Sequence, residues 1–214
     1  MRKLPDISCM VLHSYNVVMT QTSVLWAVLI ALPLLSAQEP PVEGNPKSAV
    51  RVVVYEDLQC PDCTLYRKML DEKLLPKYGN QVAFEHRDFP LPKHKWAKPA
   101  AIAARHFDRE KPALGIEFRR WVMANQTQIT PDNFEAKITE WAVGQGMEGA
   151  KLKSAMQNPG LAKLVDDEYE EGVARGIART PTVLVNGEPF IETFTLEQIS
   201  KGIDAALAAV SSAK

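Results

Sequence analysis

The chain has 214 residues, a formal net charge of −1 and 46% hydrophobic residues. This is the composition of an ordinary globular protein, long enough for one domain with an elaboration or for two small domains. The near-neutral charge gives no electrostatic reason to expect a nucleic-acid partner, because binding nucleic acid requires a basic surface.

Residues 1–37 have the layout of a secretory signal peptide. Arg2 and Lys3 are basic, an apolar run follows at 24–35, and cleavage is expected after Ala37. The apolar run is short for a membrane span, which needs about 20 residues. We therefore expect an exported protein, periplasmic or otherwise extracytoplasmic, with an uncleaved membrane anchor as the alternative.

The first structured unit should follow a polar segment at 38–48, whose Pro and Gly residues predict a linker or a loosely attached arm. The apolar run 49–55 predicts a buried strand. A helix is expected from about 61 to 78, with Pro76 kinking or ending its regular part. A second strand is expected at 81–87. Strand, helix and strand together predict a βαβ unit with parallel neighbouring strands.

A block of about 80 residues, 95–176, contains helical segments and no strand candidate. The helices are expected at 97–107, 112–125, 132–144, 148–157 and 161–175. Within this block the tryptophans Trp96, Trp121 and Trp141 lie on apolar faces and are expected to form its core. The acidic run at 166–171 is expected to be a solvated helix face.

Strand signals return after this block, at 182–185 and 189–191. They flank Asn186-Gly187, the strongest short hairpin signal, and a last helix is expected at about 196–210. The whole order is β-α-β, a helical block, then β-β-α. This order predicts an α/β, thioredoxin-like fold over 49–214 with an all-helical insertion at about 95–176.

The candidate active site is Cys60-Pro61-Asp62-Cys63, at the junction of the first strand and helix. Two cysteines three residues apart close a tight ring, so such pairs tend to cycle between dithiol and disulfide. The third cysteine, Cys9, lies in the leader, so the exported chain would keep only Cys60 and Cys63. A single Cys-x-x-Cys in an exported protein is typical of a redox catalyst rather than a disulfide scaffold.

The position of Cys60 at the helix N-terminus should lower its pKa, which makes it the expected nucleophile. Cys63, one turn further along, is then the resolving thiol. Pro61 suits the first helical turn because its missing N–H is not needed there. The thiols carry the electrons themselves, so no cofactor is expected.

A second part of the site is expected at Thr180-Pro181-Thr182, directly before the returning strand. A cis Thr180–Pro181 bond would expose the Thr180 backbone beside the sulfurs, where an extended client segment could pair with it. Cis is the minority state of such bonds, so the local residues alone do not decide between the two isomers.

Taken together, the chain resembles the DsbA-like thiol–disulfide oxidoreductases, which are thioredoxin-fold proteins with a helical insertion. The matching stretches lie at 52–63, 74–94, 100–107 and 176–187. The resemblance implies that Cys60 and Cys63 are the redox pair and that Pro181 is cis. It also implies an exported protein that exchanges disulfides with cysteine-containing proteins, and such a protein needs a membrane redox partner for recycling. Arg179 stands where the branch with a Thr-Pro-Thr loop usually has glycine.

Two departures from this family bear on mechanism. The best-known exported oxidants carry His where this chain has Asp62, and a nearby carboxylate disfavours a thiolate on Cys60. We therefore expect a moderate rather than a strong oxidant. Thioredoxin-like proteins also often bury an acid six residues before the first cysteine, where this chain has Val54. Asp57 or Glu56 could substitute, with a solvated loop acid as the alternative reading.

Other readings of the motif are weaker. The cysteines could be half of a zinc site, but the remaining soft ligands, His86, His94 and His106, share no face and are expected at or near the surface. A structural disulfide this short would close almost no loop and add little stability. The alternative functions are a chaperone or peptide-binding module and a glutathione-dependent isomerase. We expect a monomer, and the sequence leaves the direction of electron flow open.

Overall fold

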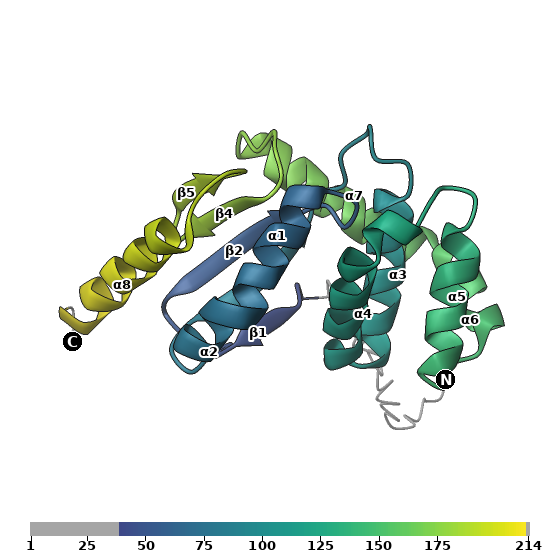
Figure 1. Ribbon diagram of the computed structural model, residues 1–214, viewed down its shortest axis with the longest axis horizontal. Coiled ribbons are helices and arrows are strands. Elements are labelled where there is room, and N and C mark those ends of the chain that lie inside the picture. The colour runs from purple at the N-terminus through teal and green to yellow at the C-terminus, as the bar shows by residue number, and fades with distance from the viewer. Residues whose placement is uncertain (1–38, 213–214) are drawn as a thin grey trace, which may run out of the picture. The chain divides into compact units, whose positions relative to one another are not determined.

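The computed structural model describes residues 39–212, so the predicted leader and Cys9 lie outside the described residues. Within this range the strands form one five-stranded sheet in the order β1-β3-β2-β4-β5 (Figure 1). The strands are β1 (Val42–Gly44), β2 (Arg51–Glu56), β3 (Ala83–Asp88), β4 (Thr182–Val185) and β5 (Glu188–Ile191). The pair β2 and β3 is parallel, as the βαβ pattern predicts, and the other neighbouring pairs are antiparallel.

The helix between β2 and β3 is continuous but changes its winding. It consists of α1 (Pro61–Met69), a π-helical segment (Leu70–Leu74) and α2 (Leu75–Tyr78). The amide of Leu75 donates to the carbonyl of Leu70, five residues back. Pro76 follows directly, and its ring and missing N–H disturb the normal i to i−4 ladder. The irregularity expected at Pro76 is therefore a widened turn just before it, and the helix continues to Tyr78.

Five α-helices and one short 3₁₀ turn lie between β3 and β4, and a last helix follows β5. They are α3 (Ala97–Glu110), α4 (Pro112–Ala124), the 3₁₀ turn (Gln126–Gln128), α5 (Phe134–Gly144), α6 (Gly149–Met156), α7 (Pro159–Ala174) and α8 (Leu196–Ser212). The predicted thioredoxin-like fold with a helical insertion is confirmed. None of the helices within 39–212 has the length and apolar character needed to cross a bilayer.

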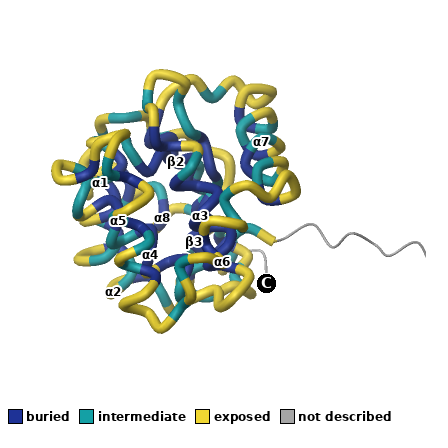
Figure 2. The backbone as a smooth tube through the Cα atoms, turned by 90° about the vertical axis from the view of Figure 1, so that its right-hand side faces the viewer, coloured by how far each residue is buried: buried dark blue, intermediate teal, exposed yellow. Residues whose placement is uncertain are grey.

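Two large apolar clusters fill the interior, and β2, β3 and most of α3 are buried (Figure 2). The first cluster packs one face of the sheet, including Val54 and Val183, against α1 and α8. The second belongs to the helical insertion, with Trp96 buried in it and Trp121 and Trp141 packed against it, as predicted. This second cluster also contains Leu58, Cys60 and Cys63. The candidate redox pair is thus packed against the insertion rather than the sheet core.

The predicted linker at 38–48 is wrong for Val42–Gly44, which form the edge strand β1 beside β3. Ion pairs rather than apolar side chains hold this strand. Glu43 accepts from Arg67 at 2.6 Å, contacts His86 Nε2 at 2.9 Å and also binds Arg120. A three-residue strand anchored through one carboxylate has no hydrophobic periodicity, and therefore the sequence gives no strand signal there.

Two predictions that charged or polar side chains would be exposed to solvent are also wrong. His86 is fully buried between Glu43 and Glu56, and His106 is buried as well, whereas His94 is half-buried. In the acidic run, Glu168 is only 8% exposed because this side of α7 faces β3, where Glu168 accepts a hydrogen bond from the Asp88 amide at 2.7 Å. The run is therefore solvated on one side only.

Candidate active site

Cys60 caps the N-terminus of α1 and is 5% exposed. Its Sγ lies 3.3 Å from the carbonyl oxygen of Thr180 and donates to it when the thiol is protonated. The pKa of Cys60 is lowered to about 6, chiefly by a hydrogen bond from the Cys63 thiol and further by the backbone amides of Cys63 and Asp62. A thiol at this position is therefore mostly ionised at neutral pH, as reactive cysteines require.

Cys63 lies one turn into α1 and is fully buried. Burial raises its pKa well above the usual value, and the neighbouring charge of Cys60 raises it further. Its Sγ accepts a hydrogen bond from the Asp57 amide at 3.3 Å. Both cysteines are free thiols in this structure. The pair therefore combines an acidic thiol that is 5% exposed with a fully buried, protonated one.

The Thr180–Pro181 peptide bond is cis, which confirms the expectation from the family resemblance. Thr180 is 2% exposed and its carbonyl oxygen faces Cys60, although the two residues are 120 positions apart in the chain. The fold thus brings together the two segments that the sequence analysis assigned to one site.

Asp57 is buried rather than solvated, so the solvated reading of this loop acid is wrong. Its carboxylate accepts from the amides of Gln59 and Leu91 and contacts His94 Nδ1, each at 2.7 Å. Burial raises the pKa of Asp57, although these hydrogen bonds act against that shift. The carboxylate therefore binds the loop before α3, while the backbone amide of the same residue holds the Cys63 sulfur.

Glu56, one residue earlier, is also buried and belongs to a charged cluster. Its Oε1 lies 3.2 Å from both His86 Nδ1 and Arg119 Nη1. Burial alone would raise the pKa of Glu56, but the two cationic partners outweigh burial and lower it. The resulting negative charge contributes to the raised pKa of Cys63. Sequence reasoning missed this cluster because its members come from separate elements and follow no spacing rule.

Asp62, whose side chain is half-buried, contributes a backbone N–H to Cys60, which lowers the pKa of the cysteine. Its side chain borders a groove of about 360 Å³ lined by Leu65, Met69 and Phe194. The expected effect of its carboxylate, compared with histidine at this position, stays a prediction.

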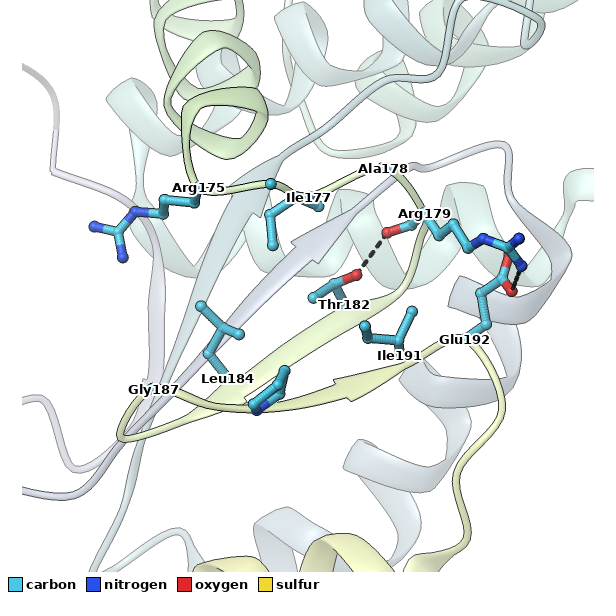
Figure 3. A pocket seen from close by; sticks show the side chains of 11 residues that line it. Arg175, Ile177, Ala178, Arg179, Thr182, Leu184, Gly187, Ile191 and Glu192 are labelled. Atoms are coloured by element: carbon cyan, nitrogen blue, oxygen red, sulfur yellow. Dashed lines mark hydrogen bonds and ion pairs between the residues drawn. The ribbon is translucent and has the colours of Figure 1, made fainter.

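A larger cavity of about 800 Å³ lies on the open face of the β4–β5 hairpin (Figure 3). The side chains of Ile177, Leu184 and Ile191 point into it from the strands and from the segment after α7. Arg179 lines its rim and forms an ion pair of 2.6 Å with Glu192. The arginine at the unusual position before Thr180 therefore anchors the end of β5 to the cis-proline loop.

Within residues 39–212, no group of three His, Cys, Asp or Glu side chains has a geometry that could hold a metal ion.

A Cys-x-x-Cys at a helix N-terminus, facing a cis-proline in a sheet interrupted by helices, defines a thioredoxin-like fold with a helical insertion. Solved structures agree. BdbD from Bacillus subtilis superposes with a TM-score of 0.71 at 20% identity, over 79% of this chain and 93% of that one. Wolbachia pipientis α-DsbA1 gives 0.71 at 17% identity, over 82% and 94%.

The chain belongs to the thioredoxin family, whose model, described as "Thioredoxin", matches residues 36–205. Among curated relatives, a candidate protein-disulfide oxidoreductase of Rickettsia prowazekii is 28% identical over 170 residues, covering 78% of this chain and 61% of that protein. The Na(+)/H(+) antiporter NhaA 1 of Mycolicibacterium gilvum is 27% identical over 165 residues, covering 74% and 26%. The chain thus spans about a quarter of the antiporter and about three fifths of the Rickettsia protein.

Proposed function

We propose that this protein is an exported thiol–disulfide oxidoreductase that exchanges disulfides with cysteine-containing client proteins through Cys60 and Cys63. The observation that carries this proposal is the asymmetry of the pair. Cys60 lies at a helix N-terminus with its pKa lowered to about 6, whereas Cys63 is fully buried with its pKa raised. This difference assigns Cys60 as the nucleophile and Cys63 as the resolving thiol.

In the oxidising direction, a client thiolate attacks Sγ of Cys60 in the Cys60–Cys63 disulfide. The S–S bond breaks, Cys63 leaves as a thiolate and takes up a proton, and a mixed disulfide joins Cys60 to the client. A second client thiolate then attacks the client sulfur of the mixed disulfide and releases Cys60 as a thiolate. The client loses two electrons and the enzyme pair gains them. The reverse sequence reduces a client disulfide.

The pKa of Cys60 supports a moderate oxidant. A value of about 6 lies between roughly 7 for thioredoxin and roughly 3.5 for the strong oxidant DsbA. A thiolate that is more stable in the reduced enzyme makes the disulfide a stronger oxidant, so this protein should fall between the two.

Client segments are proposed to bind beside the sulfurs in extended form. The backbone of Thr180, beside the cis bond, is proposed to pair with the client as an added strand, whereas Pro181 has no N–H and its carbonyl accepts from the Glu192 amide at 2.8 Å. The apolar groove at Leu65 and Phe194 can hold a client side chain. After each oxidation the dithiol needs a membrane redox partner to reoxidise it. We propose that the protein acts as a monomer outside the cytoplasm after cleavage behind Ala37.

Replacing the cysteines one at a time tests this function. With a reduced, unfolded client, the oxidised wild type should form client disulfides and Cys60→Ser should not. With a client that already contains a disulfide, Cys60 of the reduced Cys63→Ser variant attacks that disulfide and releases one client thiolate, and the mixed disulfide, which has no resolving thiol, should accumulate and be visible by mass spectrometry. A peptide-binding module would instead keep its activity in Cys60→Ser, and that result would contradict the proposal. N-terminal sequencing of the protein recovered from the periplasm tests export, with Gln38 as the expected first residue.

A further inference from the structure

The loop that carries the redox pair is held from outside the sheet, by the helical insertion. Thr64 Oγ1 donates to the Met123 carbonyl at 3.3 Å, and the Trp96 amide donates to Gln59 Oε1 at 2.8 Å. Met123 and Trp96 both belong to the helical insertion at about 95–176. The two sulfurs also lie in the apolar cluster of the insertion, as described above.

Gln126 makes the most direct of these contacts. It lies in the 3₁₀ turn between α4 and α5, and its Nε2 donates to the carbonyls of Leu58 at 2.8 Å and Cys60 at 3.1 Å. A primary amide has two N–H donors, so Gln126 uses its full donor capacity on this loop. The two acceptors are the carbonyl of Cys60 itself and the carbonyl two residues before it.

These contacts fix the peptide planes on both sides of the nucleophile. The Cys60 amide already donates to the Asp57 carbonyl at 3.0 Å, and the Cys60 carbonyl accepts from the Thr64 amide at 3.2 Å. The Gln126 bond to the same oxygen is of similar length, 3.1 Å, so the two donors share in orienting this carbonyl. The orientation matters because the N–H groups at the start of a helix stabilise a thiolate only when they point at it.

We propose that Gln126 is a positioning residue of the redox pair, which holds the Cys60 backbone so that its sulfur stays aligned with the N–H groups at the start of α1. The helical insertion thereby helps to set the redox equilibrium of the pair. This proposal rests on the redox function proposed above.

Two variants test the role of Gln126. Gln126→Met keeps the length of the side chain without its donors, and Gln126→Glu replaces both donors with acceptors that repel the two carbonyls. The control is Gln128→Met, in the same 3₁₀ turn, where the exposed side chain makes one hydrogen bond of 3.4 Å to Asn125. In each reduced protein, the Cys60 pKa is read from thiolate absorbance, and the redox equilibrium is measured against glutathione.

We expect Gln126→Met to raise the Cys60 pKa by about half a unit and to make the disulfide about threefold less oxidising. Gln126→Glu should shift both quantities further in the same direction, while Gln128→Met leaves them unchanged. If both Gln126 variants only lower the free energy of unfolding and titrate like the control, Gln126 is merely structural and the proposal is wrong. A wild-type pair that fails to exchange with glutathione contradicts the proposed function instead, and the Cys60 titration still reports on Gln126.

Discussion

Arg119 and Asp88 form an ion pair of 2.7 Å in which neither side chain is exposed to solvent. Asp88 ends β3 and Arg119 lies on α4, so the pair joins the sheet to the helical insertion. The second oxygen of Asp88 accepts from Arg105 Nε at 2.6 Å, and Arg105 also binds Glu168 on α7. Two arginines of the insertion therefore hold the end of the strand next to the strand that leads into the redox motif.

Arg119→Met should destabilise the protein strongly. The substitution leaves the buried carboxylates Asp88 and Glu56 without one of their cationic partners, and breaking a buried pair costs about 3–5 kcal/mol. The free energy of unfolding in urea measures the effect. As a control, Arg175→Met removes an exposed i, i+4 pair with Glu171 and should cost no more than about 0.5 kcal/mol. Similar losses in the two variants would contradict this account of the buried cluster.

Asp108→Asn should change how stability depends on pH. Asp108 is 8% exposed, and burial raises its pKa from 3.8 to about 6. Between about pH 4 and pH 6 the folded protein binds more protons at this site than the unfolded chain, so stability falls as pH rises. The penalty is complete above about pH 6 and absent below about pH 4, which sets the window for the measurement.

The Asn variant carries no charge at any pH and lacks this penalty. It should match the wild type below about pH 4 and exceed its unfolding free energy by about 1–3 kcal/mol at pH 8. Denaturant titrations at both pH values check the prediction. A variant that is equally stable relative to the wild type at the two pH values would show that Asp108 ionises normally in the folded protein.

Asp62→His should make the redox pair more oxidising. An imidazolium near the helix N-terminus favours the thiolate of Cys60, whereas the carboxylate of Asp62 disfavours it. We expect the Cys60 pKa to fall below its value of about 6 and the equilibrium with glutathione to shift toward the reduced enzyme. Asp62→Asn, which only removes the charge, should lie between the two. If the histidine variant has the same redox potential as the wild type, Asp62 does not tune the Cys60–Cys63 pair.

Gly115→Ala should destabilise the contact between α3 and α4. An added Cβ would lie 1.7 Å from Asp108 Oδ1 and 3.0 Å from the Asp108 amide, so the helices would have to shift. Such overpacking costs about 1–3 kcal/mol. Gly144→Ala is the matched helical control, since its Cβ would meet no atom within 4 Å, and it should stabilise the protein by up to about 1 kcal/mol. Thermal unfolding of both variants distinguishes the local clash from the general effect of replacing glycine.

The sequence was sufficient for those parts of the fold that follow a short-range pattern. The apolar run before Cys60, the hairpin signal Asn186-Gly187 and the helical block each produce the element expected of them. The turn has Asn186 at φ 46° and Gly187 at φ 96°, conformations that these two residue types adopt readily. The cis isomer at Pro181 depended on the family resemblance, because the residues around it do not decide between the two isomers.

The remainder of the site could not be predicted because it depends on distant partners. Asp57 is a loop acid in sequence, and only the fold places His94 and the Leu91 amide against its carboxylate. Glu43 anchors β1 through arginines from two different helices, a combination that no spacing rule describes. Buried ion pairs arise wherever the packed elements happen to face each other, so their members look like surface charges in the sequence.

Pro189 in the edge strand β5 has a consequence for how the sheet meets other chains. Val185 and Glu188 close a two-residue hairpin, so the next pair, Leu184 and Pro189, is a pair without mutual hydrogen bonds. The nitrogen of Pro189 therefore faces the outer edge, where it offers no hydrogen to an incoming strand. The β5 edge of the sheet is therefore a poor place for an unfolded client to add a strand and aggregate with the protein.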